Sequence, residues 1–375
     1  MKKVGIMSMQ RIANYGSFLQ AYALKKLIEE LNCKVEFVDY HVGTPVIAED
    51  ADSNNKLIRK LKKGLETLQY RAPLSHKVSF IRYKQDFCKK YMPVLGINET
   101  MNYTPVLDCL VIGSDEVFNC IQKNSNVGYS TELFGENNNA KRLITYAASF
   151  GNTTLQKLKK YKKADEVSSL LKSFDAISVR DENSGKIIES LTGEKPIYNL
   201  DPVLTYDYIN DCDRISEIKA KEKYMILYAY SGRISDHEAE WIAQYAKKKK
   251  LKIYAIGGIQ KCADRFIDCS PFDVLGYFKN ADEIITDTFH GSIFSIITHR
   301  PFTTLVRKSV GNSYGNEEKL SDLLKRLDLL DRMTTDIINA EQINAQMVDY
   351  QKVDSILQMQ RAYAKEYLRK NIGVS

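Results

Sequence analysis

The sequence predicts an α/β protein with two Rossmann-like domains that face each other across a cleft, each built on a mostly parallel sheet. Three observations indicate this class. Short β-rich apolar runs alternate with amphipathic helical segments, which favours parallel sheets with helices on both faces. The alternation stops at one polar segment and then restarts, and 375 residues are many for a single core. We therefore expect domains at 1–205 and 215–340, followed by a helical tail at 341–375.

The predicted N-terminal domain begins with a strand at 4–8, where an apolar run turns polar at Ser8. A helix is expected at 17–31, because apolar residues recur there at helical spacing. Further β-rich runs predict strands at 34–40, 107–112, 143–147 and 176–179.

The segment 199–214 is rich in Asp and Asn and contains Asp201-Pro202, so we interpret it as the linker between domains. After it, the pattern predicts strands at 224–230, 251–256, 283–286 and 302–306 and helices at 236–250, 271–278, 292–299 and 317–327. The stretch from 342 to about 370 is polar and free of proline. We expect it to form a helical tail that packs back across the domains.

Composition limits the classes of protein that fit. The seven cysteines are scattered without a C-x-x-C pair, which argues against a disulfide framework and against structural zinc. The first apolar run is too short for a signal-peptide core, and no run approaches the length of a membrane span. The sequence therefore predicts a reducing, cytoplasmic location.

A basic stretch lies within the N-terminal half, as a predicted helical insertion at 55–92. Between Lys56 and Lys90 there are eleven basic residues against two acidic ones. One interpretation is a solvated helical face. Another is attraction to an anionic membrane surface, because leucine and isoleucine recur at helical spacing among the cations of 56–65. Nucleic acid is not an expected partner, since the rest of the chain lacks basic patches with interleaved aromatics.

The segment Asp287-Thr288-Phe289-His290-Gly291 is the most informative motif. It follows a predicted strand and precedes a predicted helix, so His290 should lie at the ligand-binding edge of a sheet, beside a helix N-terminus that favours anions. A histidine there can transfer protons near neutral pH. The alternative is a polar residue that only helps to end the loop. Asp287 is either a residue that holds the loop through backbone N–H groups or a catalytic one.

Polar residues follow other predicted strands. Asn14-Tyr15-Gly16-Ser17 opens the first helix, where Gly16 permits close backbone approach and Ser17 is a natural cap. Asp115 and Glu116 end the strand 107–112, and either carboxylate could act as a general base. Arg180 ends the strand 176–179, so its guanidinium either reaches the cleft or pairs with Asp181.

Together these motifs resemble the polysaccharide pyruvyl transferase family, from about residue 4 to Arg332. The resemblance rests on five segments in the family's order: Asn14-Tyr15-Gly16 with Leu19–Leu24, Val111–Asp115 with Phe118-Asn119, Ser178–Asp181, Asp201–Leu204 and Asp287–Gly291. It implies a GT-B-like fold and transfer of the enolpyruvyl unit of phosphoenolpyruvate onto two hydroxyls of one sugar, which forms a pyruvate ketal. The implied acceptor is a surface polysaccharide or its lipid-linked precursor, which would place the protein at the inner leaflet.

The resemblance also suggests roles for individual residues. His290 would act as general acid or phosphate partner and Asp115 as general base. Donor binding is expected from Arg180, Gly291, Ser292, Arg307 and Lys308, and acceptor binding from Asn14, Tyr15, Gly16 and Glu116. No metal is expected, because no suitable Asp-x-Asp pair is present. No cofactor is implied beyond phosphoenolpyruvate as donor substrate.

Thr288 departs from the family's pattern, in which an arginine often stands two residues before the motif histidine. A threonine cannot supply that charge, so either the donor-binding set is rearranged or the donor differs. This leaves two alternatives: a GT-B-like glycosyltransferase with a nucleotide-sugar donor, or a non-catalytic member that binds glycan.

Overall fold

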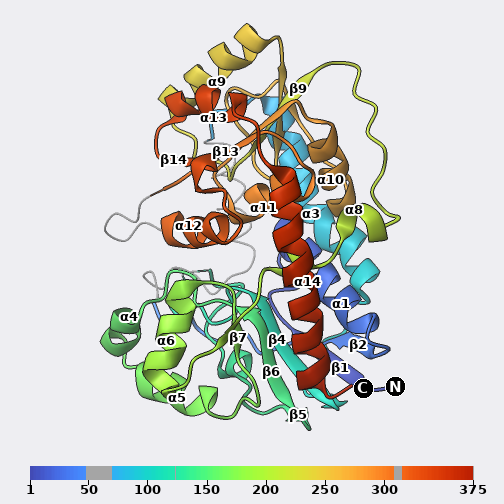
Figure 1. Cartoon of the computed structure of the whole chain (residues 1–375), viewed down its shortest axis with the longest axis vertical. Coiled ribbons are helices and arrows are strands. Elements are labelled where there is room, and N and C mark those ends of the chain that lie inside the picture. Colours follow the sequence, from blue (N-terminus) through green and yellow to red (C-terminus); the bar gives the residue numbers. More distant parts are fainter. Residues whose placement is uncertain (48–69, 123, 308–314, 375) are drawn as a thin grey trace.

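The computed structural model describes residues 1–47, 70–122, 124–307 and 315–374. Within these residues the chain forms two α/β domains, one above the other in Figure 1, and each contains a six-stranded sheet whose paired strands are all parallel. The predicted fold class is confirmed.

The N-terminal sheet has the strand order β2-β1-β4-β6-β7-β8. Its central strands β4 and β6 are buried along their whole length, as expected for a parallel sheet covered on both faces. The strands are β1 (Lys3–Met7), β2 (Lys34–Phe37), β4 (Cys109–Asp115), β6 (Leu143–Ala148), β7 (Ser178–Val179) and β8 (Ile197–Tyr198). The helices are α1 (Tyr15–Glu29), α3 (Leu74–Leu95), α4 (Leu155–Lys160), α5 (Ala164–Leu171) and α6 (Glu182–Thr192), with a small sheet of β3 (Val106–Leu107) and β5 (Asn139–Ala140) and a 3₁₀ turn at Thr131–Phe134.

The C-terminal sheet has the order β11-β10-β9-β12-β13-β14. Its strands are β9 (Tyr224–Tyr228), β10 (Lys252–Ile256), β11 (Arg265–Phe266), β12 (Glu283–Thr286), β13 (Phe302–Leu305) and β14 (Met333–Thr334). The helices are α9 (Asp236–Lys249), α10 (Pro271–Asn280), α11 (Phe289–Ile297), α12 (Glu317–Arg326) and α13 (Ala340–Ala345), with 3₁₀ turns at Leu330–Arg332 and Ile337–Asn339. β9 and β12 lie side by side, so their carboxyl ends meet at one edge.

The segment predicted as the linker connects the two sheets, but much of it is buried. It contains the short helices α7 (Pro202–Thr205) and α8 (Tyr208–Asp211), and α7 packs against α1. Asp201 caps α7 through the N–H of Val203 and is 1% exposed. Its Asp and Asn residues therefore cap helices and form buried contacts instead of marking an exposed loop.

The C-terminal helix α14 (Tyr350–Ile372) crosses both domains, as Figure 1 shows. Its Tyr350 hydroxyl donates to the carbonyl of Arg300 in the C-terminal domain (2.6 Å). Its Tyr367 hydroxyl donates to the carbonyl of Thr145 in β6 (2.8 Å), so the tail packs back across the domains.

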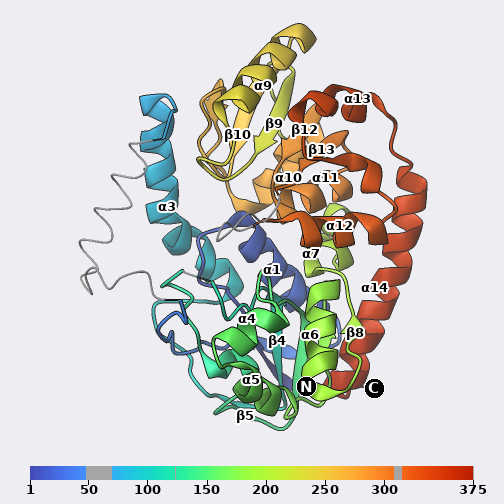
Figure 2. The same ribbon diagram turned by 90° about the vertical axis from the view of Figure 1, so that its left-hand side faces the viewer.

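Helix α3 joins the domains on the side away from α14 (Figure 2). Its buried Tyr83 and Phe87 pack against α1, and the ring of Phe80 meets that of Phe266 in β11 with centroids 5.6 Å apart. This half of the predicted basic insertion is thus anchored in the core. The segment 56–65, which carries the pattern of cations and leucines, lies outside the described residues. Within the part of the chain that the structure describes, no helix is both long and apolar enough to span a bilayer.

Candidate active site

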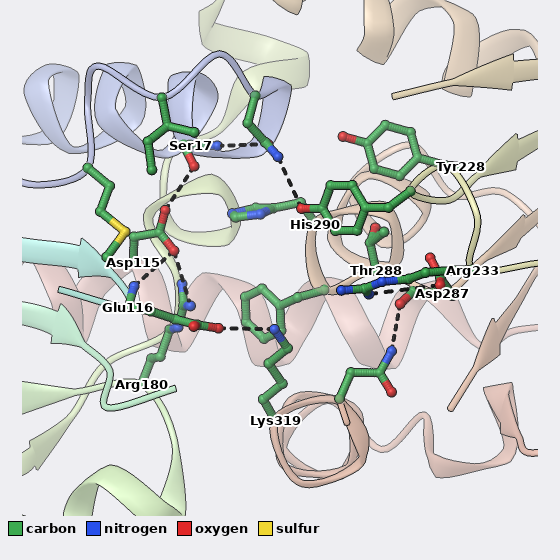
Figure 3. Close-up of a pocket in the computed structure, with 16 residues that line it drawn as sticks. Ser17, Asp115, Glu116, Arg180, Tyr228, Arg233, Asp287, Thr288, His290 and Lys319 are labelled. Atoms are coloured by element: carbon green, nitrogen blue, oxygen red, sulfur yellow. Dashed lines mark hydrogen bonds and ion pairs between the residues drawn. The ribbon is translucent and has the colours of Figure 1, made fainter. Parts of the chain in front are cut away.

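A pocket of about 230 Å³ opens between the two domains, where the carboxyl ends of β4 and β9 and the residues after β1, β7 and β12 come together. This is the edge of an open α/β sheet at which ligands bind. Figure 3 shows the side chains that converge there. The N-terminal domain contributes Met9, Ile12, Asn14, Ser17, Asp115, Glu116 and Arg180, and the C-terminal domain contributes Tyr228, Tyr230, Arg233, Asp287, Thr288, Phe289, His290, Asn316 and Lys319.

Thr288 is the N-cap of α11, and its hydroxyl accepts a hydrogen bond from the N–H of Gly291 (2.9 Å). The hydroxyl of Ser292 is buried and donates to the carbonyl of Thr288 (3.1 Å). The polar groups of Gly291 and Ser292, both expected to bind the donor, are therefore engaged within the protein. The first N–H groups of the helix, at Phe289 and His290, have no partner within the helix and are closer to the pocket.

His290 lies between a buried carboxylate and the start of α1. Its Nε2 is 3.7 Å from Oδ2 of Asp201, an ion-pair separation that is too long for a hydrogen bond. Burial opposes ionisation of Asp201, but His290 and Arg180 together hold the pKa of this carboxyl below its usual value. A Cβ on Gly16 would lie 2.2 Å from Nδ1 of His290, so the imidazole can occupy this position only because residue 16 is glycine.

Arg180 is almost completely buried in the N-terminal wall, by which we mean the pocket residues that the N-terminal domain contributes; those of the C-terminal domain form the C-terminal wall. Its guanidinium donates to Oδ2 of Asp201 (2.9 Å) and reaches Oδ1 of Asp115 (3.5 Å), and it stacks on the ring of Phe289 at 4.6 Å. Burial alone would lower the pKa of the guanidinium, but the surrounding carboxylates outweigh it and raise that pKa. Its expected alternative partner Asp181 instead caps α6 through the N–H of Ser184. Arg180 therefore forms ion pairs with two carboxylates of the protein itself.

The two carboxylates after β4 face different partners. Asp115 has φ +79°, and its Oδ2 accepts from the hydroxyl of Ser17 (2.9 Å). Glu116 accepts from Lys319 of α12 across the pocket (3.1 Å). Asn14 also joins the domains, because it caps α1 and donates to the hydroxyl of Tyr230 (3.0 Å).

Two other expected residues, Tyr15 and Arg307, do not line the pocket. The ring of Tyr15 is buried against Tyr83, with its hydroxyl donating to the carbonyl of Cys269 (3.1 Å), so it does not line the pocket. Arg307 is held by Glu238 at 2.5 Å and likewise lies outside the pocket lining. Lys308 is outside the described residues.

The structure adds cations that the sequence patterns did not single out. Arg233 follows β9, and its guanidinium lies over the ring of Tyr230 at 4.7 Å and 3.9 Å from Oδ2 of Asp287. A charged residue in the turn that follows the predicted strand 224–230 was the available signal for Arg233. Lys319 lies in the first turn of α12 and carries no comparable signal. Burial raises the pKa of Asp287 to about 6.

The arrangement provides cations, carboxylates and one imidazole around a space large enough for a small anion. Among the described residues, no three potential ligands from His, Cys, Asp and Glu are grouped to hold a metal ion. Chemically, such a site can bind clustered negative charge and move protons, which suits group transfer.

Solved structures are similar to this chain over nearly its whole length. The structure of S. aureus MnaA with UDP has a TM-score of 0.50 at 12% identity, with 100% of this chain and 98% of that chain covered. The UDP-GlcNAc 2-epimerase from Neisseria meningitidis bound to UDP-GlcNAc has a TM-score of 0.47 at 11% identity, with 99% of each chain covered. No curated protein sequence matches significantly. The fold is GT-B-like, and the family model for polysaccharide pyruvyl transferase matches residues 14–309. The chain is a transferase that belongs to the polysaccharide pyruvyl transferase family.

Proposed function

We propose that this transferase moves the enolpyruvyl unit of phosphoenolpyruvate onto two hydroxyls of one sugar in a surface polysaccharide or its lipid-linked precursor. The product is a cyclic pyruvate ketal, and phosphate is released. The observation that carries the proposal is the placement of His290, backed by the buried Asp201, at an interdomain pocket that also contains three cations.

The donor carries a phosphate and a carboxylate, so its site must offset clustered negative charge. Arg233, Lys319 and Arg180 bring positive charge to the pocket, and the N-terminus of α11 adds backbone N–H groups and the positive end of a helix dipole. In this proposal Arg233 and Lys319 take the donor-binding role that the family resemblance suggested for Arg307. Asp115 accepts a hydrogen bond from Ser17 and lies beside Arg180, whereas Glu116 is paired with Lys319, so the donor competes with Glu116 for Lys319.

Proton transfer follows from the same geometry. Protonated His290, stabilised by Asp201, donates its proton to C3 of the donor while a sugar hydroxyl attacks C2 and gives its proton to Asp115. Loss of phosphate then allows the second hydroxyl to attack C2 and close the ketal. Of the two hydroxyl protons, one balances the proton gained by the methyl group and the other leaves with phosphate. Asn14, on the same wall, would contact the acceptor.

One observation favours a second candidate, a glycosyltransferase with a nucleotide-sugar donor. Thr288 caps α11 with its hydroxyl and brings no charge to the pocket. The position at which an arginine often helps to hold phosphoenolpyruvate in this family therefore carries no charge here, which removes one reason to prefer phosphoenolpyruvate as the donor.

Thermal unfolding separates the two candidates. We expect phosphoenolpyruvate to raise the Tm of the wild type, since a ligand at a hundred times its Kd adds about 2.7 kcal/mol of stability. Nucleotide sugars should not raise it. His290→Gln should still bind the donor but lose about a hundred- to ten-thousandfold in phosphate release with an acceptor glycan. A shift from a nucleotide sugar alone would favour the glycosyltransferase, and full activity of His290→Gln would favour a non-catalytic role for this residue.

We also propose that the enzyme works in the cytoplasm, at the inner leaflet, where a lipid-linked acceptor would be presented. The support is the basic sequence pattern of 56–90. Sedimentation with anionic and with neutral vesicles tests it, and equal binding to both would contradict the electrostatic attachment.

A further inference from the structure

Arg233 and Asp287 form an unusual pair on the C-terminal wall of the pocket (Figure 3). The side chain of Asp287 is 0% exposed, and neither carboxylate oxygen has a hydrogen-bond partner among the described residues. The nearest cation is Arg233, whose Nη1 lies 3.9 Å from Oδ2. The side chain of Arg233 is 33% exposed, so it faces both the buried acid and the open pocket.

The other arginines near the pocket are held more closely. Arg180 lies 2.9 Å from Asp201, and Arg307 lies 2.5 Å from Glu238. Lys319 lies 3.1 Å from Glu116. The contact of Arg233 with Asp287 is beyond hydrogen-bond range, so a ligand that draws Arg233 away gives up only a weak, longer-range attraction.

We infer that Arg233 and Asp287 are an exchangeable ion pair, in which an anionic ligand takes over the guanidinium and leaves Asp287 to become protonated. The inference rests on the proposed function for the identity of the ligand, which there is the phosphate or carboxylate of phosphoenolpyruvate. Arg233 is thus a ligand-binding residue, and Asp287 is a positioning residue that acts through it.

The surroundings of Asp287 support proton uptake. Burial raises the pKa of its carboxyl to about 6, while Arg233, Arg307 and the nearby backbone N–H of Tyr230 work against that rise and Glu238 adds to it. His290 is close in sequence, and Asn316 binds the backbone carbonyl of Asp287 and not its carboxylate. When a ligand neutralises Arg233, the main charge that favours ionised Asp287 is lost, so the pKa rises further and a proton is taken up near neutral pH. Ligand affinity should therefore fall as the pH rises above about 6.

Calorimetry of ligand binding at pH 7, in two buffers with different ionisation enthalpies, measures the protons taken up per ligand. The probes are phosphoenolpyruvate, UDP and inorganic phosphate. Since the ligand phosphate and other groups of the site can also exchange protons, the informative quantity is the difference in proton uptake between wild type and Asp287→Asn. We expect Asp287→Asn to take up fewer protons and to bind at least as tightly, because its Arg233 is no longer shared.

Arg233→Gln should weaken binding about tenfold or more, the loss expected for one charge-assisted hydrogen bond. Arg233→Lys should recover part of the affinity, which also guards against misfolding of a single variant. Arg265→Gln is the matched control, because Arg265 pairs with Glu222 at an exposed position outside the pocket lining. It should bind as the wild type does.

The outcomes separate this inference from the proposed function. If UDP binds in place of phosphoenolpyruvate and still depends on Arg233, the donor assignment is wrong and the exchangeable pair stands. If phosphoenolpyruvate binds and neither Arg233→Gln nor Asp287→Asn differs from Arg265→Gln, the pair is wrong and the function stands. Binding of none of the three anions to the wild type overturns both.

Discussion

The two walls of the pocket are built differently. On the N-terminal wall, Arg180 joins Asp201 and Asp115, and Ser17 holds the second oxygen of Asp115. On the C-terminal wall, Arg233 and Asp287 meet only at 3.9 Å, and the carboxylate makes no hydrogen bond to a described residue. The first wall has its charges balanced before a ligand arrives, whereas the second has groups whose charge and position can still change. The difference suggests that the N-terminal wall is the fixed wall, whose side chains keep their positions when a ligand binds. The C-terminal wall is then the responsive wall, in which Arg233 and Asp287 change partner or charge.

The largest expected effect comes from breaking the N-terminal wall. Arg180→Met would leave the carboxylates of Asp201 and Asp115 buried without their cation, and we expect a loss of about 3–5 kcal/mol in the free energy of unfolding. Urea unfolding at pH 7 measures it.

Arg265→Met provides the control for that change. Arg265 is an exposed partner of Glu222, so its loss should cost less than about 1 kcal/mol. Equal losses for the two variants would show that the Arg180 network does not hold the wall together.

Asp287→Asn changes the C-terminal wall, and it should raise the free energy of unfolding where Arg180→Met lowers it. Because the folded pKa of Asp287 is raised to about 6, the folded state favours the protonated acid. Ionisation of Asp287 therefore does not affect the free energy of unfolding of the wild type below about pH 4. It lowers that free energy as the pH rises from about 4 to 6, and the loss persists above about pH 6. The difference of about two pKa units amounts to about 3 kcal/mol. Because asparagine does not ionise, Asp287→Asn lacks this loss and should be more stable than the wild type at pH 7.

Urea unfolding between pH 4 and pH 8 measures this effect. The advantage of Asp287→Asn must grow with pH. An advantage independent of pH would mean that the buried carboxylate is not the cause.

Gly16→Ala should lower the free energy of unfolding by a smaller amount, because it disturbs only the contact between Gly16 of the N-terminal domain and His290 of the C-terminal domain. The added Cβ would lie 2.2 Å from Nδ1 of His290, so the imidazole must shift, at a cost of about 1–3 kcal/mol. Phosphate release should fall along with stability. In a His290→Gly background the clash is absent, since this change also removes the Cβ of His290 that lies 2.8 Å from the added Cβ, and Gly16→Ala should then be neutral or stabilising, because alanine is the better helix former. Equal costs in both backgrounds would assign the effect to α1 alone.

The sequence predicted those parts of this site that follow from local patterns. His290 was found because the junction of strand β12 and helix α11 is visible as a change from an apolar run to helical spacing. Arg180, Asp115 and Asn14 were found at strand ends or a helix start for the same reason, and all three line the pocket. The alternation of β-rich runs with amphipathic helical segments likewise predicted the two parallel sheets.

Residues whose roles depend on tertiary contacts were not recoverable in this way. Asp201 lies in a polar segment that reads as a linker, and only packing against Arg180 and His290 gives it a place in the site. Arg307 follows a strand just as Arg233 does, but Glu238 of α9 holds it away from the pocket lining. Tyr15 precedes the glycine that admits His290, yet its own ring turns into the aromatic cluster with α3.

The smallest expected effect concerns Lys319, which connects the responsive wall to the fixed one through Glu116 at 3.1 Å. Both side chains are about one fifth exposed, and removal of the charge in Lys319→Gln should cost about 1 kcal/mol or less. The sharper measurement is a double-mutant cycle with Glu116→Gln, by thermal or urea unfolding with and without phosphoenolpyruvate. If the anion draws Lys319 toward itself, as the contrast between the walls implies, the coupling energy between the two residues should fall when the ligand binds. An unchanged coupling would place Lys319 with the fixed wall and leave Arg233 as the responsive cation among the described residues.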